Sequence, residues 1–169
     1  MKDEHFATVF FGIIAILIMF VVPVVLVGYN RRLSAETKAN EIIEEFIDDC
    51  RATAYFTEND YEDLQTKLDA LGCRWDVSIY HYSTQYEADT NGKVYTYEVV
   101  YDTKEIGDKL YEDMNVGVAK YEMKYGDKIE VKAVSKTEFM GVNFASLFVG
   151  GLENRIIIDL AEQIDNNAD

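Results

Sequence analysis

The sequence predicts an α+β protein with a long N-terminal helix, transmembrane and then amphipathic, a helix hairpin and a small antiparallel sheet domain. Three observations predict this order. An uncharged apolar stretch runs from Phe6 to Gly28, and apolar residues then recur at helical spacing as far as Leu71. After Gly72 the apolar period shortens to two residues, which is typical of strands. We therefore expect an anchor with its tail at residues 1–32 and an acidic domain at residues 33–169.

The uncharged stretch is long enough to cross a membrane. As a helix it would reach roughly 34 Å, against a hydrocarbon core about 30 Å thick. We interpret it as a retained single-pass anchor in the cell membrane and not as a secretory signal peptide, whose apolar region is only about 7 to 15 residues long. No Ala-x-Ala cleavage pattern precedes the flank at residues 29–32. The anchor residues of interest are Phe6, Gly12, Ala15, Pro23 and Gly28.

Charge excludes one class of partner. The chain has a net charge of −15, and the acidic excess lies after Arg32. Such a body is repelled by nucleic acid and by anionic membrane surfaces, so nucleic acid is not an expected partner. Basic residues at the two ends of the span are nearly balanced, which leaves either topology open. We expect the domain to be extracytoplasmic, because its tyrosine-rich and strand-rich sequence is of a kind common outside cells.

An amphipathic helix follows the span without an intervening Gly or Pro. Its acidic and polar residues fill the positions between apolar ones, so the span and this segment predict one helix of about 50 residues. Its apolar side must be covered by a partner or by the protein's own domain. The candidate packing stripe consists of Leu33, Ala39, Ile42, Ile43, Phe46, Ile47 and Cys50.

A second helix is predicted after a short loop at Tyr55 and Phe56. Thr57 is a good cap, Asp60 completes a capping box, and Gly72 is a stop signal. The loop is short enough to hold the two helices antiparallel within residues 33–72. Cys50 and Cys73 lie in this region, and their spacing leaves open either a disulfide or two separate thiols.

The sheet-rich part is expected at residues 73–162. Trp75, Val77, Ile79 and His81 share one face of a strand, and Asn91-Gly92 predicts a turn into a returning strand at residues 93–101. A short helix follows at residues 102–114. Residues 118–123 and 128–135 predict two further strands around a tight turn at residues 125–127.

The end of the chain gives weaker signals. Residues 143–149 predict a helical turn or a packed loop that ends at Gly150-Gly151. The run from Arg155 to Leu160 suits either a helix start or a strand, and its isoleucines favour a strand. We expect the polar residues 163–169 to be frayed.

Motifs for catalysis and for cofactors are absent from the sequence. His5 and His81 fit no metal-ligand spacing, and the phosphate-loop, dinucleotide and nucleophile-elbow patterns do not occur. Acidic pairs on the first helix lack the calcium-loop pattern, so we interpret them as a solvated face. We expect no enzyme activity, no cofactor and no metal. Tyrosines are typical of interfaces, and the candidate partner surface consists of Tyr80, Tyr82, Tyr86, Tyr95 and Tyr97.

The order of elements resembles a pilin-like subunit, and most of all the TadE-like pseudopilins and related pilus-assembly membrane proteins of Gram-positive bacteria. The resemblance is carried by Lys2-Asp3-Glu4 before the span, Pro23 within it, the helix pair at residues 36–72 and the strand region at residues 125–139. Type IV prepilins have a Gly before Phe at this point and a carboxylate inside the span. Here His5 precedes Phe6, and the span contains no carboxylate.

The resemblance implies a structural component of a bacterial pilus or secretion-type envelope assembly, which acts by helix packing and partner binding. Its expected partners are membrane lipid and other membrane or pilus-assembly subunits, including further copies of itself. An anchored extracytoplasmic binding or sensory module unrelated to pili is the alternative.

Overall fold

The computed structural model describes residues 2–90, 93–112, 119–136 and 155–167, with side chains from residue 8 onward except at residues 111 and 112. The chain divides into two compact units. The first comprises Met1–Ala35 and Glu138–Arg155, and the second comprises Glu36–Thr137 and Ile156–Asp169. The predicted turn at residues 91–92, the segment at residues 143–149 and the pair at residues 150–151 lie outside the described residues.

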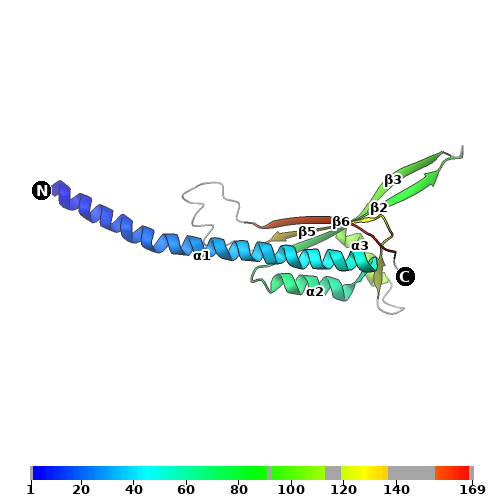
Figure 1. Cartoon of the computed structure of the whole chain (residues 1–169), viewed down its shortest axis with the longest axis horizontal. Coiled ribbons are helices and arrows are strands. Elements are labelled where there is room, and N and C mark those ends of the chain that lie inside the picture. The colour runs from blue at the N-terminus through cyan, green and yellow to red at the C-terminus, as the bar shows by residue number, and fades with distance from the viewer. Residues whose placement is uncertain (1, 91–92, 113–118, 137–154, 168–169) are drawn as a thin grey trace. The chain divides into compact units, whose positions relative to one another are not determined.

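The long N-terminal helix is confirmed. Helix α1 runs from Lys2 to Thr53 with Pro23 inside it (Figure 1). It ends where Ala54 adopts a left-handed conformation with φ of 59°, and the amide of Ala54 still donates to the Cys50 carbonyl at 2.8 Å. A left-handed residue after the last turn is a common way to end a helix.

In the second unit, the C-terminal part of α1 and helix α2 (Glu58–Asp69) form the expected hairpin. Thr57 and Asp60 make the predicted capping box, in which the Thr57 amide donates to the Asp60 carboxylate at 2.8 Å. An ion pair between Lys67 and Glu45, at 3.4 Å, joins the end of α2 to α1 about two turns before α1 ends. Thr53 at the end of α1 and Asp60 at the start of α2 line the same groove, so the helices run antiparallel. The connection is not a simple loop, because Tyr55–Thr57 forms the short strand β1.

A four-stranded antiparallel sheet in the order β3-β2-β5-β6 forms the other layer of this unit. Its strands are β2 (Trp75–Ala88), β3 (Val94–Tyr101), β5 (Lys128–Ser135) and β6 (Ile157–Gln163). The predicted two-stranded ribbon of β2 and β3 is thus one half of a larger sheet. The predicted run at Arg155–Leu160 becomes strand β6 from Ile157 onward, as its isoleucines favoured.

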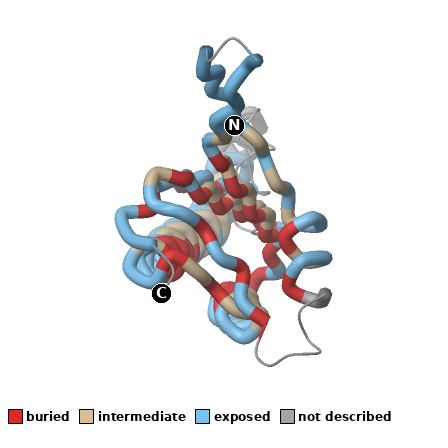
Figure 2. The backbone as a smooth tube through the Cα atoms, turned by 90° about the vertical axis from the view of Figure 1, so that its right-hand side faces the viewer, coloured by how far each residue is buried: buried red, intermediate tan, exposed pale blue. Residues whose placement is uncertain are grey.

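Strand β2 changes partner along its length. Its first half, Trp75–Tyr82, pairs with β5, and its second half, His81–Ala88, pairs with β3. Buried residues alternate with more accessible ones along the strands (Figure 2). The predicted core face of β2 is confirmed, because Trp75, Val77, Ile79 and His81 are all buried.

One strand prediction needs correction. Of the strand predicted at residues 118–123, the described residues 119–123 contain the short strand β4 (Lys120–Glu122), which pairs with β1 and not with β5. A positive φ of 90° at Gly126 turns the chain into β5. Helix α3 (Thr103–Glu112) follows β3 as expected and buries Ile106 and Leu110.

The prediction that residues 163–169 are frayed also needs correction. Strand β6 continues to Gln163, and Ile164 is fully buried. The Ile164 amide donates to the Asp127 carbonyl at 2.7 Å, and its own carbonyl accepts from the Gly126 amide at 3.0 Å. An apolar anchor and two backbone hydrogen bonds therefore hold the described part of the tail against the β4–β5 turn.

Candidate functional site

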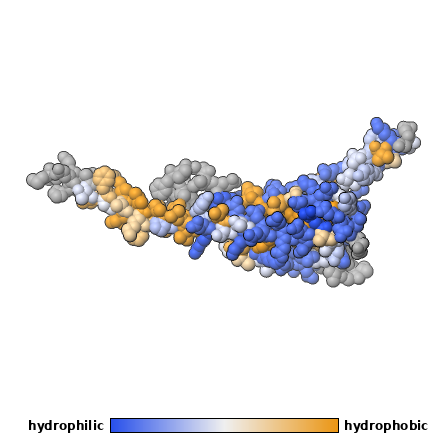
Figure 3. All heavy atoms as spheres, in the orientation of Figure 1, coloured by the Kyte–Doolittle hydropathy of each residue, from blue (hydrophilic) through white to orange (hydrophobic). Residues whose placement is uncertain are grey.

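The N-terminal part of α1 is the first candidate surface. Its most apolar window has a mean hydropathy of 3.2, and none of that window is buried within the protein. Hydrophobic side chains cover this part of the helix (Figure 3). The core helix of a soluble protein would instead be covered by other elements. This single helix is therefore long and apolar enough, by length and composition, to cross a membrane.

The described anchor residues lie on this exposed helix. Gly12 and Ala15 are exposed, and a side chain added at Gly12 would meet open space. Pro23 lies inside the helix without ending it. Gly28 is half-buried, and the side chain of Phe6 lies outside the described part of the chain.

The candidate packing stripe is mostly used within the second unit. Ala39, Ile43, Phe46, Ile47 and Cys50 are buried. Phe46 contacts Phe56 of β1 edge to face and lines a groove together with Leu64 of α2, and Ile47 shares another groove with Leu160 of β6. Of the two covers that the sequence allowed, the protein's own domain is the one observed here.

Two members of the stripe depart from it. Ile42 is half-buried at the rim of the groove between α1 and α2, and Leu33 is 51% exposed. The buried residue at that level is Ala35, which the sequence analysis missed. Ala35, Ala39, Phe46 and Cys50 follow spacings of four and seven residues, which keeps one helix face inward, whereas Leu33 is off this face.

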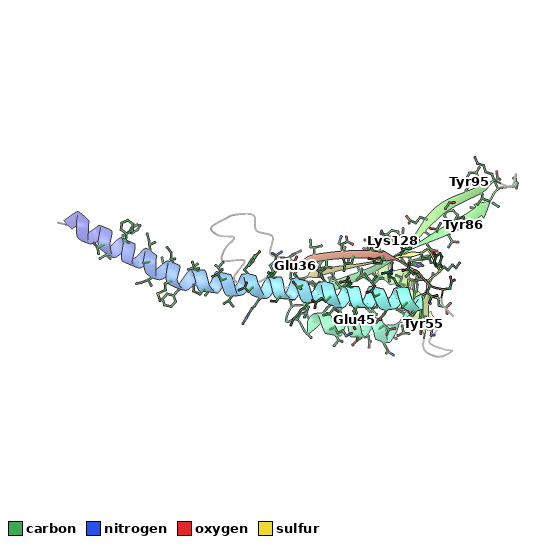
Figure 4. All side chains as sticks on the ribbon, viewed as in Figure 1. Glu36, Glu45, Tyr55, Tyr86, Tyr95 and Lys128 are labelled. Carbon is green, nitrogen blue, oxygen red and sulfur yellow. The ribbon has the colours of Figure 1, made fainter. Side chains whose placement is uncertain are left out.

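The hairpin of β2 and β3 is the second candidate surface. Beyond Tyr82, β2 has no β5 residue beside it, so the two strands continue alone past the rest of the sheet (Figure 1). Tyr86 and Tyr95 lie on this projecting ribbon (Figure 4). Tyr86 is 73% exposed, and Val94 is 60% exposed.

The sheet register divides the five candidate tyrosines between two faces. Tyr80, Tyr82 and Tyr86 alternate with the buried residues of β2 and thus lie on its outer face. Tyr95 pairs with Glu87 and Tyr97 with Gln85, which places them on the same face as His81. The tyrosines therefore lie on both faces of the ribbon and do not form one continuous patch.

A buried polar cluster around His81 is the principal feature that the sequence did not reveal. His81 Nδ1 lies 2.8 Å from the Tyr121 hydroxyl, and His81 Nε2 lies 2.8 Å from Asp127 Oδ2. Asp127 also accepts from the Lys124 amide at 2.9 Å. The three side chains come from β2, β4 and the β4–β5 turn, so the cluster joins three segments distant in sequence.

Burial shifts the pKa values of His81 and Tyr121 in this cluster. It lowers the pKa of His81 below its ordinary value, although Asp127 opposes the shift. It also raises the pKa of Tyr121. Neutral His81 can then donate from Nε2 to Asp127 and accept the Tyr121 proton at Nδ1, which satisfies every partner. Only the alternation of β2 pointed to His81, and no sequence spacing linked it to Asp127 or Tyr121.

Lysine ammonium groups lie over several tyrosine rings. Lys109 Nζ lies 3.8 Å from the ring centre of Tyr101, and Tyr101 stacks on His81. Lys128 Nζ lies 4.8 Å from the ring centre of Tyr82. These two contacts lie at the base of the ribbon, where β2, β3 and β5 meet. Farther out, Lys93 Nζ lies 5.3 Å from the ring centre of Tyr95.

The two cysteines are separate buried thiols. Cys50 shares a groove with Asp60 near the start of α2, whereas Cys73 follows the end of that helix. A helix of this length separates its ends by roughly 15 Å, far beyond the Cα separation of about 7 Å that a disulfide tolerates. Burial raises the pKa of both thiols, which makes them poor nucleophiles.

Across the described residues, no group of three histidine, cysteine or acidic side chains is arranged to hold a metal ion. Comparisons of the chain with protein-family models, with curated proteins and with solved structures found no match. Function must therefore be inferred from the geometry of the second unit and from the exposed apolar helix.

Proposed function

We propose that this protein is a single-pass membrane-anchored structural component of a bacterial pilus or secretion-type envelope assembly. It acts by helix packing and partner binding and has no catalytic role. The observation that carries the proposal is the uncovered apolar part of α1, which continues as helix into a folded α+β unit. The apolar part requires lipid or other helices around it, because water would solvate it poorly.

The projecting ribbon supports the binding role. It presents tyrosines on two faces, and tyrosine supplies a large contact area with few rotatable bonds. The same observation favours the second candidate function, an anchored extracytoplasmic binding or sensory module unrelated to pili. Membrane lipid and other envelope subunits, including further copies, are the partners of the first candidate.

Fractionation tests the anchor. Full-length protein should remain in carbonate-washed membranes and require detergent for release. Replacing Leu17 and Ile18 with arginine should shift it toward the soluble fraction, because each charge near a bilayer centre costs about 3 kcal/mol. The control places arginines at Tyr125 and Ile157, which are exposed in the second unit. Recovery of the unaltered chain in the soluble fraction without detergent would refute the proposal.

Topology and assembly need a separate experiment. Neither native cysteine is a good reporter because both are buried, so we would introduce Tyr125→Cys, a position that is 68% exposed. Labelling by an impermeant thiol reagent in intact cells should succeed at this position and fail in the parent chain. A large complex on native gels supports the assembly role, whereas a purely monomeric detergent particle favours the sensory module.

A further inference from the structure

Strand β3 forms one edge of the sheet. The register shows which of its residues point their backbone N–H and C=O groups toward β2 and which point them outward. The Asp89 amide donates to the Lys93 carbonyl at 2.9 Å, which makes this a hydrogen-bonded pair. Such pairs alternate with non-bonded pairs along an antiparallel ladder. Tyr95, Tyr97, Val99 and Tyr101 therefore bond to β2. The residues whose N–H and C=O groups point away from β2 are Val94, Thr96, Glu98 and Val100.

The uncovered edge of β2 shows the same alternation of backbone direction, and it also shows how side chains can cover a strand edge. Where β3 stops, side chains of α2 and α3 take its place along β2. Gln65 donates to the Trp75 carbonyl at 3.3 Å, and Tyr61 donates to the Val77 carbonyl at 3.5 Å. The Thr103 hydroxyl accepts from the Ile79 amide at 2.8 Å. All three β2 residues are odd-numbered, as the derived alternation requires.

The outer edge of β3 has no comparable cover within the described part of the chain. Its outward N–H and C=O groups have no partner there, and the strand is exposed on both faces along most of its length. Natural edge strands usually carry proline, lysine or a bulge that blocks pairing. Residues 94–101, VYTYEVVY, have only Glu98 as a charged residue and contain neither proline nor lysine.

A second copy of the chain fits this edge poorly because of its charge. The chain carries a net charge of −15, and the edge strands of the four-stranded sheet that a copy could offer are β3 and β6. The charged residues of these two strands, Glu98, Asp159 and Glu162, are all acidic. A copy would therefore add acidic side chains to an edge that already carries Glu98.

We propose that the outer edge of β3 receives an extended strand from a different polypeptide, and that this strand carries basic side chains. Beyond Tyr82, the described part of the ribbon bears Glu87, Asp89 and Glu98 against Lys93, so the two strands beside the open edge are net acidic. Backbone hydrogen bonds supply affinity in this mode, and the alternating side chains supply specificity. The inference rests on the proposed partner-binding role and names the binding mode and the partner's charge.

Thr96→Pro is the sharpest test. Proline removes an outward N–H without removing a bond to β2, and edge strands tolerate proline at such positions. The matched control is Thr96→Val, which keeps the N–H. The probe is a fluorescent peptide of the same length as β3, in which valine alternates with threonine and lysine. Binding to the full chain in detergent micelles is followed by fluorescence anisotropy.

We expect the parent chain and Thr96→Val to bind this peptide, and Thr96→Pro to bind it about tenfold more weakly. Glu98→Lys keeps the backbone intact and should shift preference toward a peptide with glutamate in place of lysine. Equal binding by Thr96→Pro, no binding by the parent chain, or indifference to peptide charge each overturns the inference. A dimer of the parent chain that Thr96→Pro abolishes would assign the edge to a second copy and also overturn it.

The peptide-binding results can be distinguished from a failure of the proposed anchoring and assembly role. Peptide binding through β3 concerns the second unit, whereas carbonate extraction and native-gel size concern anchoring and assembly. A membrane complex that survives Thr96→Pro would leave the assembly role standing and remove the edge from it.

Discussion

His81 and Asp127 lie 46 positions apart in sequence, yet His81 Nε2 is 2.8 Å from Asp127 Oδ2. Both residues are only 4% exposed. This contact ties the central strand of the sheet to the turn before β5, and the Tyr121 hydroxyl extends it to β4. A buried network that satisfies each of its members specifies one arrangement of these segments, because any other would leave a polar group unpaired.

Replacing His81 with leucine should destabilise the second unit by about 2 to 3 kcal/mol, because Asp127 and Tyr121 would lose a buried partner. Urea unfolding of the full chain in detergent micelles, followed by the fluorescence of the buried Trp75, measures the change. The double variant His81→Leu with Asp127→Asn should regain part of the loss. Tyr125→Phe, at an exposed position, is the control. An unchanged midpoint for His81→Leu would remove the structural role of the cluster.

Acidification should weaken the same unit through His81. Burial lowers the pKa of His81 in the folded state. At a pH just below the ordinary histidine pKa of about 6.5, His81 therefore binds a proton in the unfolded chain but stays neutral in the folded chain. The resulting stability is present above that pH and is lost as the pH falls toward the folded-state pKa. The free energy of unfolding should therefore decline between about pH 7 and pH 5, and His81→Leu should flatten the decline. Identical slopes for the two proteins would contradict this assignment.

Local signals in the sequence predicted much of the fold. The capping box at Thr57 and Asp60, the alternation beginning at Trp75, and the unbroken helical pattern through Arg51 each depend on neighbours within a few residues. Partner choice within the sheet depended on distant residues instead. Nothing near residues 120–122 indicates that they pair with residues 55–57, because that ladder is closed by the packing of Phe56 on Tyr121.

The candidate surfaces were predicted less completely for a related reason. Tyrosine content identified the ribbon, but only the register shows that Tyr86 and Tyr95 lie on opposite faces. The edge of β3 is open because β3 is the terminal strand in the order β3-β2-β5-β6, which is a property of the whole sheet. Leu33 was placed on the stripe because leucine is apolar, whereas the helix turns Ala35 inward. The membrane role and the pilin-like assembly stay predictions.

Cys50 and Cys73 should stay unlinked under oxidising conditions. The length of α2 separates them, and both thiols are buried with a raised pKa. Treating the folded full chain with a mild oxidant should give no faster-migrating band on a non-reducing gel. Denaturing the protein first should permit the crosslink. A disulfide that forms in the folded chain would contradict the antiparallel arrangement of α1 and α2.

The inward face of α1 in the second unit can be tested with one matched pair of substitutions. Ile43 on α1 is fully buried, whereas Ile157 on β6 is 52% exposed. Ile43→Ala should cost about 3 to 4 kcal/mol, since it removes buried methylene groups and leaves a cavity. Ile157→Ala should cost about 1 kcal/mol or less, because it loses mainly strand propensity. Urea unfolding with Trp75 fluorescence compares the two. Equal losses would mean that Ile43 does not face the core, and the stripe would then again be available to a partner helix.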